Sequence, residues 1–97
     1  MEIQIMNPLE IERHKISQID RSIIELLDQR FEVVRTIADI KREHKIPVFQ
    51  AEIEQKVLEK VSNLSRNKDS SIEIFKTIMH QSKKFQEDLA QWQKKLA

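Results

Sequence analysis

The sequence predicts an all-α protein with three helices in each chain, one of them very long. The 97 residues contain no glycine and only two prolines, whereas about seven glycines would be expected at a usage of roughly 7%. Hairpins and sheets depend on glycine for backbone angles that other residues resist. About a third of the residues are charged, and Lys, Glu, Gln, Ile and Leu are abundant. Long helices joined by few turns explain these observations.

The first helix is expected to start at Asn7-Pro8-Leu9-Glu10. Asn7 can cap the helix, proline suits the first helical position, and Glu10 stands where the acid of a capping box would. Helical periodicity then continues without a breaker to about Lys45. Pro47 disfavours helical geometry at Ile46, and so it ends the element.

A second helix is expected from about Ala51 to Leu64, and residues 65–69 are polar and turn-like. Residues 70–73 (Ser-Ser-Ile-Glu) form a second capping box, which predicts that the third helix starts there. This helix is expected to fray near Leu96, with Trp92 facing inward. The chain therefore reads as one domain over residues 1–97, with its core in about 7–92.

The length of the first helix predicts a homodimer. About 37 helical residues would span about 55 Å, but a compact monomer of this size is only about 30 Å across. The helix cannot be buried within its own chain, and its apolar side chains continue along most of its length. We therefore expect an intertwined helical homodimer.

Charged residues interrupt the apolar seam of this helix. In alternating steps of three and four, the seam reads Arg13, Ile16, Asp20, Ile23, Leu27, Arg30, Val34, Ile37 and Lys41. A purely structural seam would be apolar throughout, and buried cations need acidic partners or an anionic ligand. Asp20 is best explained by an ion pair. The three cations together favour an anion site only slightly over ion pairing.

The spacing of these cations also favours a dimer. Arg30 and Lys41 are three turns apart, about 16 Å, so their long side chains can reach one small molecule. Arg13 lies about 25 Å from Arg30, too far within one straight helix, but an antiparallel partner could supply its own Arg13. The third helix adds neutral polar groups, because its seam reads Ile72, Phe75, Met79, Ser82, Gln86 and Leu89. Glu54 on the second helix adds one acid.

Other function classes lack support in the sequence. The formal net charge is +1, which does not indicate nucleic acid binding. The chain has no cysteine, and no segment approaches the roughly 18 apolar residues of a membrane span, so we expect a soluble cytoplasmic protein. His14, His44 and His80 lack metal-ligand spacing, and Lys83-Lys84 is expected to be solvated surface.

The residues on these seams resemble those of the small all-helical chorismate mutases. The similarity runs from Asn7-Pro8-Leu9 to about residue 90, and no single piece of it is specific. Its specificity lies in the ordered set at these spacings, namely Arg13, Arg30, Lys41, Glu54, Ser82 and Gln86. The resemblance implies a cofactor-free isomerase that converts chorismate to prephenate.

The resemblance also implies roles for these residues. Arg30 and Arg13 of a second chain would clamp the two substrate carboxylates, because guanidinium groups suit bidentate contacts. Lys41 would contact a carboxylate and the ether oxygen of the breaking bond, and Gln86 would donate a hydrogen bond to the same ether oxygen. Glu54, helped by the backbone near Gln50, would accept a hydrogen bond from the ring hydroxyl, and Ser82 would line the pocket beside a carboxylate.

The sequence departs from the family pattern at two positions and leaves other functions open. Many members carry Asp near the position of Gln50 and a basic residue at that of Ile53, so the substrate affinity of this chain is in question. An isochorismate-pyruvate lyase or an aminodeoxychorismate mutase of the same fold would use a similar pocket. A non-catalytic dimerisation or regulatory module is a further alternative, and association with another shikimate-pathway enzyme is compatible with the sequence.

Overall fold

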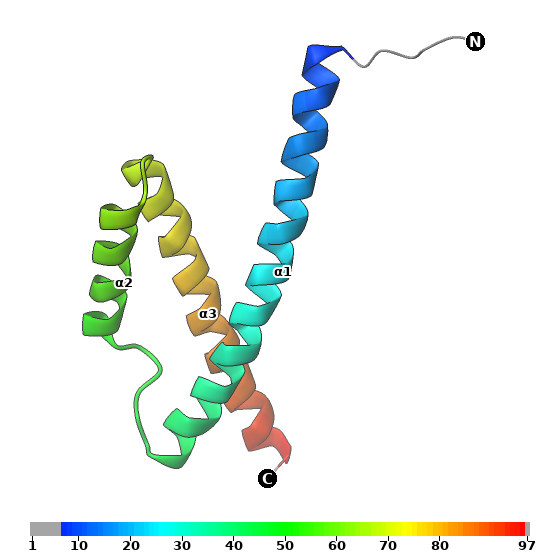
Figure 1. Ribbon diagram of the computed structural model, residues 1–97. Helices are drawn as coiled ribbons and strands as arrows, with labels where there is room; N and C mark the ends of the chain where they lie inside the picture. The colour runs from blue at the N-terminus through cyan, green and yellow to red at the C-terminus, as the bar shows by residue number, and fades with distance from the viewer. Residues whose placement is uncertain (1–6, 97) are drawn as a thin grey trace. The chain divides into compact units, whose positions relative to one another are not determined.

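The computed structural model describes residues 7–96, and these form three α-helices joined by two short connections. Helix α1 spans Pro8–Glu43, α2 spans Ala51–Leu64 and α3 spans Lys68–Leu96 (Figure 1). No strand occurs in this part of the chain, so the predicted all-α class is confirmed. The structure divides into two compact units, one ending at Glu32 and the other beginning at Val33.

The start of α1 follows from its sequence as predicted. The Asn7 side-chain oxygen accepts a hydrogen bond of 2.8 Å from the backbone N–H of Glu10. This bond satisfies one of the amide groups that a helix start leaves without a partner. Pro8 occupies the first helical position, where its missing N–H costs nothing.

Helix α1 ends two residues earlier than predicted, in a Schellman motif. The N–H of Ile46 donates to the carbonyl of Lys41 at 2.8 Å, and the N–H of Lys45 donates to that of Arg42 at 3.3 Å. This pair of bonds requires a left-handed residue at the turn, and Lys45 supplies it with φ of 55°. The chain leaves this turn toward Pro47, which cannot continue a helix.

Helix α2 begins and ends where it was predicted, but α3 begins earlier. The predicted capping box at Ser70 is wrong, because Lys68 and Asp69 already belong to the helix. The Ser65 hydroxyl accepts a hydrogen bond of 3.1 Å from the N–H of Asn67 and lies 2.6 Å from the Ser71 hydroxyl. These contacts close the turn between the helices and move the start of α3 toward α2.

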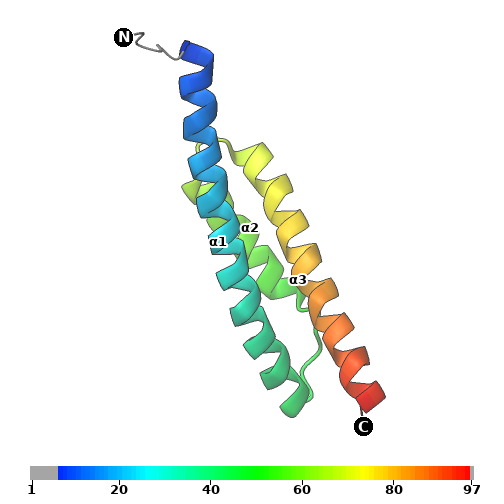
Figure 2. The same ribbon diagram turned by 90° about the vertical axis from the view of Figure 1, so that its right-hand side faces the viewer.

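Helices α2 and α3 pack side by side in the unit that begins at Val33 (Figures 1 and 2). Val61 and Met79 are buried there, as is Val34 near the end of α1. The predicted seam of α3 is confirmed, because Met79, Ser82 and Gln86 are its buried residues. Trp92 was expected to face inward but is 56% exposed in the single chain. Within residues 7–96, none of the helices combines the length and apolar character needed to cross a bilayer.

Candidate functional site

A small cluster of polar groups in the second unit surrounds the ammonium group of Lys41. Lys41 lies on the last turn of α1 and is only partly exposed. Its Nζ donates one hydrogen bond of 2.8 Å to the carbonyl of Val48 and another of 3.3 Å to Oε1 of Gln86 on α3. The Schellman motif makes the first bond possible, because it turns the chain back so that Val48 reaches the helix it has just left.

Gln86 is held at both ends of its amide. Its Oε1 accepts from Lys41, and its Nε2 donates to the backbone carbonyl of Ser82 at 3.3 Å. The orientation of the amide follows from its neighbours, since an ammonium group can only donate and a carbonyl can only accept. Gln86 is 8% exposed, so this arrangement also satisfies a buried amide that would otherwise destabilise the fold.

Two effects act in opposite directions on the charge of Lys41. Burial removes water from the ammonium group and lowers the pKa of Lys41 below its ordinary value of 10.5. The carboxylate of Glu54 on α2 raises the pKa of Lys41 but offsets only part of this effect. Lys41 therefore sits in a partly desolvated environment in which electrostatic interactions are stronger than in water.

One N–H of Lys41 is left for a ligand. An ammonium group carries three donors, and among the described residues two acceptors engage two of them. The third can donate to an oxygen atom of a bound molecule. Two fixed acceptors also define the direction in which that donor is presented, which is the kind of preorganisation that favours catalysis by charge stabilisation.

Ser82 and Gln50 are each held by hydrogen bonds close to their own helices. Ser82 is buried, and its hydroxyl donates to the carbonyl of Ile78 on its own helix at 2.8 Å. The Gln50 side chain is exposed and makes no capping hydrogen bond, while its carbonyl accepts from the N–H groups of Ile53 and Glu54. Gln50 therefore begins α2 with its backbone, which places Glu54 in the first turn of that helix.

The two predicted arginines belong to the first unit. Arg13 is exposed on α1, and Arg30, four turns or more further along the same helix, is partly buried. Asp20 was expected to form an ion pair, but it is exposed and makes none among residues 7–96. The structure thus brings Lys41, Val48, Glu54 and Gln86 together within its second unit.

Three parts of this cluster were not predicted from the sequence. The Val48 carbonyl has no signature in the sequence, because every residue carries the same group. Lys83 was assigned to solvated surface together with Lys84, and this is wrong for Lys83. It is partly buried, with its ammonium 4.9 Å from the centre of the Phe49 ring, whereas Lys84 is exposed. Helical spacing from Gln86 could have suggested Lys83, but not its partner.

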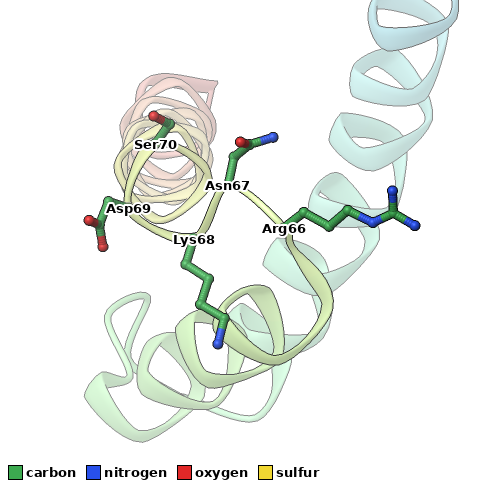
Figure 3. Close-up of a pocket in the computed structure, with 5 residues that line it drawn as sticks. All are labelled: Arg66, Asn67, Lys68, Asp69 and Ser70. Atoms are coloured by element: carbon green, nitrogen blue, oxygen red, sulfur yellow. The ribbon is translucent and has the colours of Figure 1, made fainter.

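A surface hollow of about 450 Å³ lies elsewhere, at the turn between α2 and α3. Arg66, Asn67, Lys68, Asp69 and Ser70 line it. Their side chains fan outward from the turn in different directions (Figure 3), and none of the predicted site residues is among them. Among the described residues, no group of His, Asp and Glu side chains is placed to hold a metal ion. The cluster at Lys41 is therefore the better candidate site.

Comparison with known proteins agrees with the resemblance seen in the sequence. A family model described as chorismate mutase type II matches residues 12–87. No curated protein and no solved structure gives a significant match. The matched segment includes every predicted site residue.

Proposed function

Because this chain belongs to the chorismate mutase type II family, we propose that it rearranges chorismate to prephenate within one substrate molecule. The observation that carries the proposal is the joint engagement of Lys41 by Gln86 and the Val48 carbonyl. It leaves a preorganised N–H donor in a partly desolvated site. The reaction supplies phenylalanine and tyrosine biosynthesis, and its substrate carries two carboxylates.

The proposed reaction does not need a general acid or a general base. The rearrangement is pericyclic, so no proton is transferred and no covalent enzyme intermediate forms. The protein accelerates it by holding the reactive conformer and by stabilising the negative charge that grows on the ether oxygen. In our proposal the third N–H of Lys41 donates to that oxygen. Metal ions and organic cofactors have no part in it.

Gln86 has a second task in this mechanism. Without substrate its oxygen faces Lys41 and its nitrogen faces the Ser82 carbonyl. Nε2 carries two N–H groups, so the one that is not bonded to Ser82 can donate to the ether oxygen while Oε1 still accepts from Lys41. In our proposal Lys41 and Gln86 therefore both donate to the ether oxygen and keep the hydrogen bond between them.

The remaining residues would bind the rest of the substrate. Arg30 and Arg13 of a second subunit would clamp the two carboxylates, because paired N–H groups match carboxylate oxygens. Glu54, whose charge already acts on Lys41, would accept from the ring hydroxyl beside the backbone of Gln50. Ser82 would line the wall near a carboxylate.

The exposed apolar surface of α1 supports a homodimer. Large apolar side chains that are 40–61% exposed on this helix include Leu9, Ile11, Ile16, Ile19, Ile23, Ile24, Leu26, Val33, Ile37 and Ile40. In the single chain only Val34, Val61 and Met79 are buried apolar residues among those described. A core this small would not stabilise a domain of this length, so we propose that a second copy covers α1 and supplies Arg13.

The deciding experiment follows the absorbance of chorismate with and without purified protein. The proposal expects decay at a rate proportional to enzyme, with prephenate as the product, and loss of this activity in Lys41→Ala. The matched control is Lys56→Ala, an exposed lysine on α2, which should retain activity. Parallel assays with isochorismate and aminodeoxychorismate test the lyase and the aminodeoxychorismate mutase alternatives. If the protein leaves all three substrates unchanged, the non-catalytic module becomes the better interpretation.

A further inference from the structure

Backbone hydrogen bonds hold both ends of the connection between α1 and α2, but not its middle. Within the described chain, residues 47–49 make none to other backbone groups. The carbonyl of Val48 nevertheless lies on the Lys41 ammonium at 2.8 Å. A further side-chain contact can therefore help to fix the position of residues 47–49.

Phe49, the residue next to Val48, makes such a contact. The ring of Phe49 lies beneath the ammonium of Lys83, 4.9 Å from ring centre to Nζ, well within the range of a cation–π interaction. Phe49 is 53% exposed, so burial of its ring contributes little to holding it against α3. The side chain of Lys83, which contacts this ring, is partly buried, whereas that of its neighbour Lys84 is exposed.

These contacts form a closed ring of interactions. Lys41 bonds to Val48 and to Gln86, Val48 is followed by Phe49, and Phe49 contacts Lys83. Lys83 and Gln86 are three residues apart on α3, and thus are neighbours on the surface of the helix. One turn of α3 therefore positions both acceptors of Lys41. It carries Gln86, and through Lys83 it contacts Phe49, the neighbour of Val48.

We propose that the contact between Lys83 and Phe49 fastens residues 47–49 to α3 and so keeps the Val48 carbonyl on Lys41. Phe49 and Lys83 are then positioning residues for the ammonium group that acts on the ether oxygen. This inference rests on the proposed function for its effect on catalysis, but not for its effect on the segment itself. Neither residue needs to touch the substrate.

The test uses the whole protein and the variants Phe49→Leu and Lys83→Met, each of which removes the contact while keeping apolar bulk. Exposed cation–π pairs are weak, so we expect kcat to fall about two- to fivefold in each variant, and no further in the double variant. Lys83→Arg preserves a cation for the ring and should restore kcat. Lys84→Met is the matched control, and its kcat should equal that of the wild type.

A charge effect of Lys83 predicts a different result. If Lys83 only attracted the dianionic substrate, Lys83→Met would raise KM and leave kcat unchanged, and Phe49→Leu would change neither constant. Either that pattern or additive losses in the double variant would overturn the proposal. Circular dichroism of each variant identifies any that fails to fold, in which case Phe49→Met and Lys83→Gln, which also remove the contact, take their places with the same expectations.

A measurement without substrate separates this inference from the proposed function. Backbone ¹⁵N order parameters of Val48 and Phe49 should lie in the rigid range, about 0.85, in the wild type and fall toward about 0.6 in Phe49→Leu and Lys83→Met. If the wild type proves inactive on all three substrates but these values fall, the fastening stands and the proposed function fails. If the values do not change, the fastening is wrong, whatever the activity.

Discussion

Lys41 near the end of α1 donates a hydrogen bond to Gln86 on α3, although 45 positions separate them in the sequence. The bond joins a positively charged group to the side-chain amide that is buried in the same unit. A ligand as the third acceptor requires Lys41 to be protonated, because a neutral amine has only enough N–H donors for Val48 and Gln86. This dependence on charge makes the site sensitive to pH.

Activity and stability should respond to pH in opposite directions. Burial lowers the pKa of Lys41, so kcat/KM should fall as pH rises through a value below 10.5. In the same interval the unfolded chain binds the proton more readily than the folded chain. The contribution of Lys41 to the free energy of unfolding should therefore rise with pH up to 10.5.

Urea unfolding of the wild type and of Lys41→Met, at one fixed chain concentration, measures the stability effect as a difference. The wild type should gain relative to the variant as pH rises through this interval. Titration of kcat/KM over the same range measures the activity effect. An activity limb that falls only above 10.5 would contradict the assigned environment of Lys41.

Gln86→Glu distinguishes a donor from an acceptor at this position. An ionised carboxylate can still accept from Lys41, but it cannot donate to the ether oxygen. If Gln86 is a donor, kcat should fall at neutral pH by about 10²-fold or more, as when one charge-stabilising donor is removed. Activity should return as pH falls and the acid protonates, at a pH that burial raises and the Lys41 ammonium lowers relative to the ordinary glutamate pKa of about 4.3.

The control for this experiment is Gln81→Glu, at an exposed position on the same helix, which should keep the neutral-pH activity. Full activity of Gln86→Glu at pH 7 would mean that Gln86 acts only by holding Lys41. The comparison thus decides between the two tasks that the geometry allows for this amide.

The helix ends show how far the sequence could predict the fold. Asn7 and Pro47 act locally, through a cap and a restricted backbone, and both predictions hold to within a few residues. The predicted start of α3 was wrong, because the hydroxyl groups of Ser65 and Ser71 form a hydrogen bond across the turn. That contact depends on how the chain folds back, and a local capping rule cannot take it into account.

The site shows the same limit. Lys41 and Gln86 could be selected because polar residues on a helical seam are unexpected. Lys83 and Lys84 have the same side chain and adjacent positions, and only the direction of α3 relative to residues 44–50 makes one of them contact Phe49. The choice between them needs the packed structure, as does the carbonyl of Val48.

The proposed dimer predicts complementation between two inactive chains. In a mixed dimer of Arg13→Ala and Gln86→Ala, one site combines the intact Gln86 of the first chain with the intact Arg13 of the second. The other site carries both defects. If half of the dimers are mixed, about a quarter of the wild-type activity should return after the chains are unfolded and refolded together.

Lys41→Ala mixed with Gln86→Ala is the matched control, because both residues come from one chain and every site keeps a defect. It should recover nothing. Equal lack of recovery in both mixtures would mean that Arg13 does not act on the site of a second subunit, and sedimentation of the wild type would then show whether it associates at all.

Lys45→Gly should stabilise the protein. Lys45 has φ of 55° at the Schellman turn, and a residue with a Cβ is strained there by about 1–2 kcal/mol relative to glycine. Glycine loses about 0.5–1 kcal/mol through the greater freedom of the unfolded chain, so the net effect is a gain of up to about 1.5 kcal/mol. Urea unfolding at fixed chain concentration measures it, with Lys60→Gly in the exposed interior of α2 as a control that should lose about 1 kcal/mol. A loss in Lys45→Gly comparable to that in the control would mean that Lys45 does not adopt the left-handed conformation that returns Val48 to Lys41.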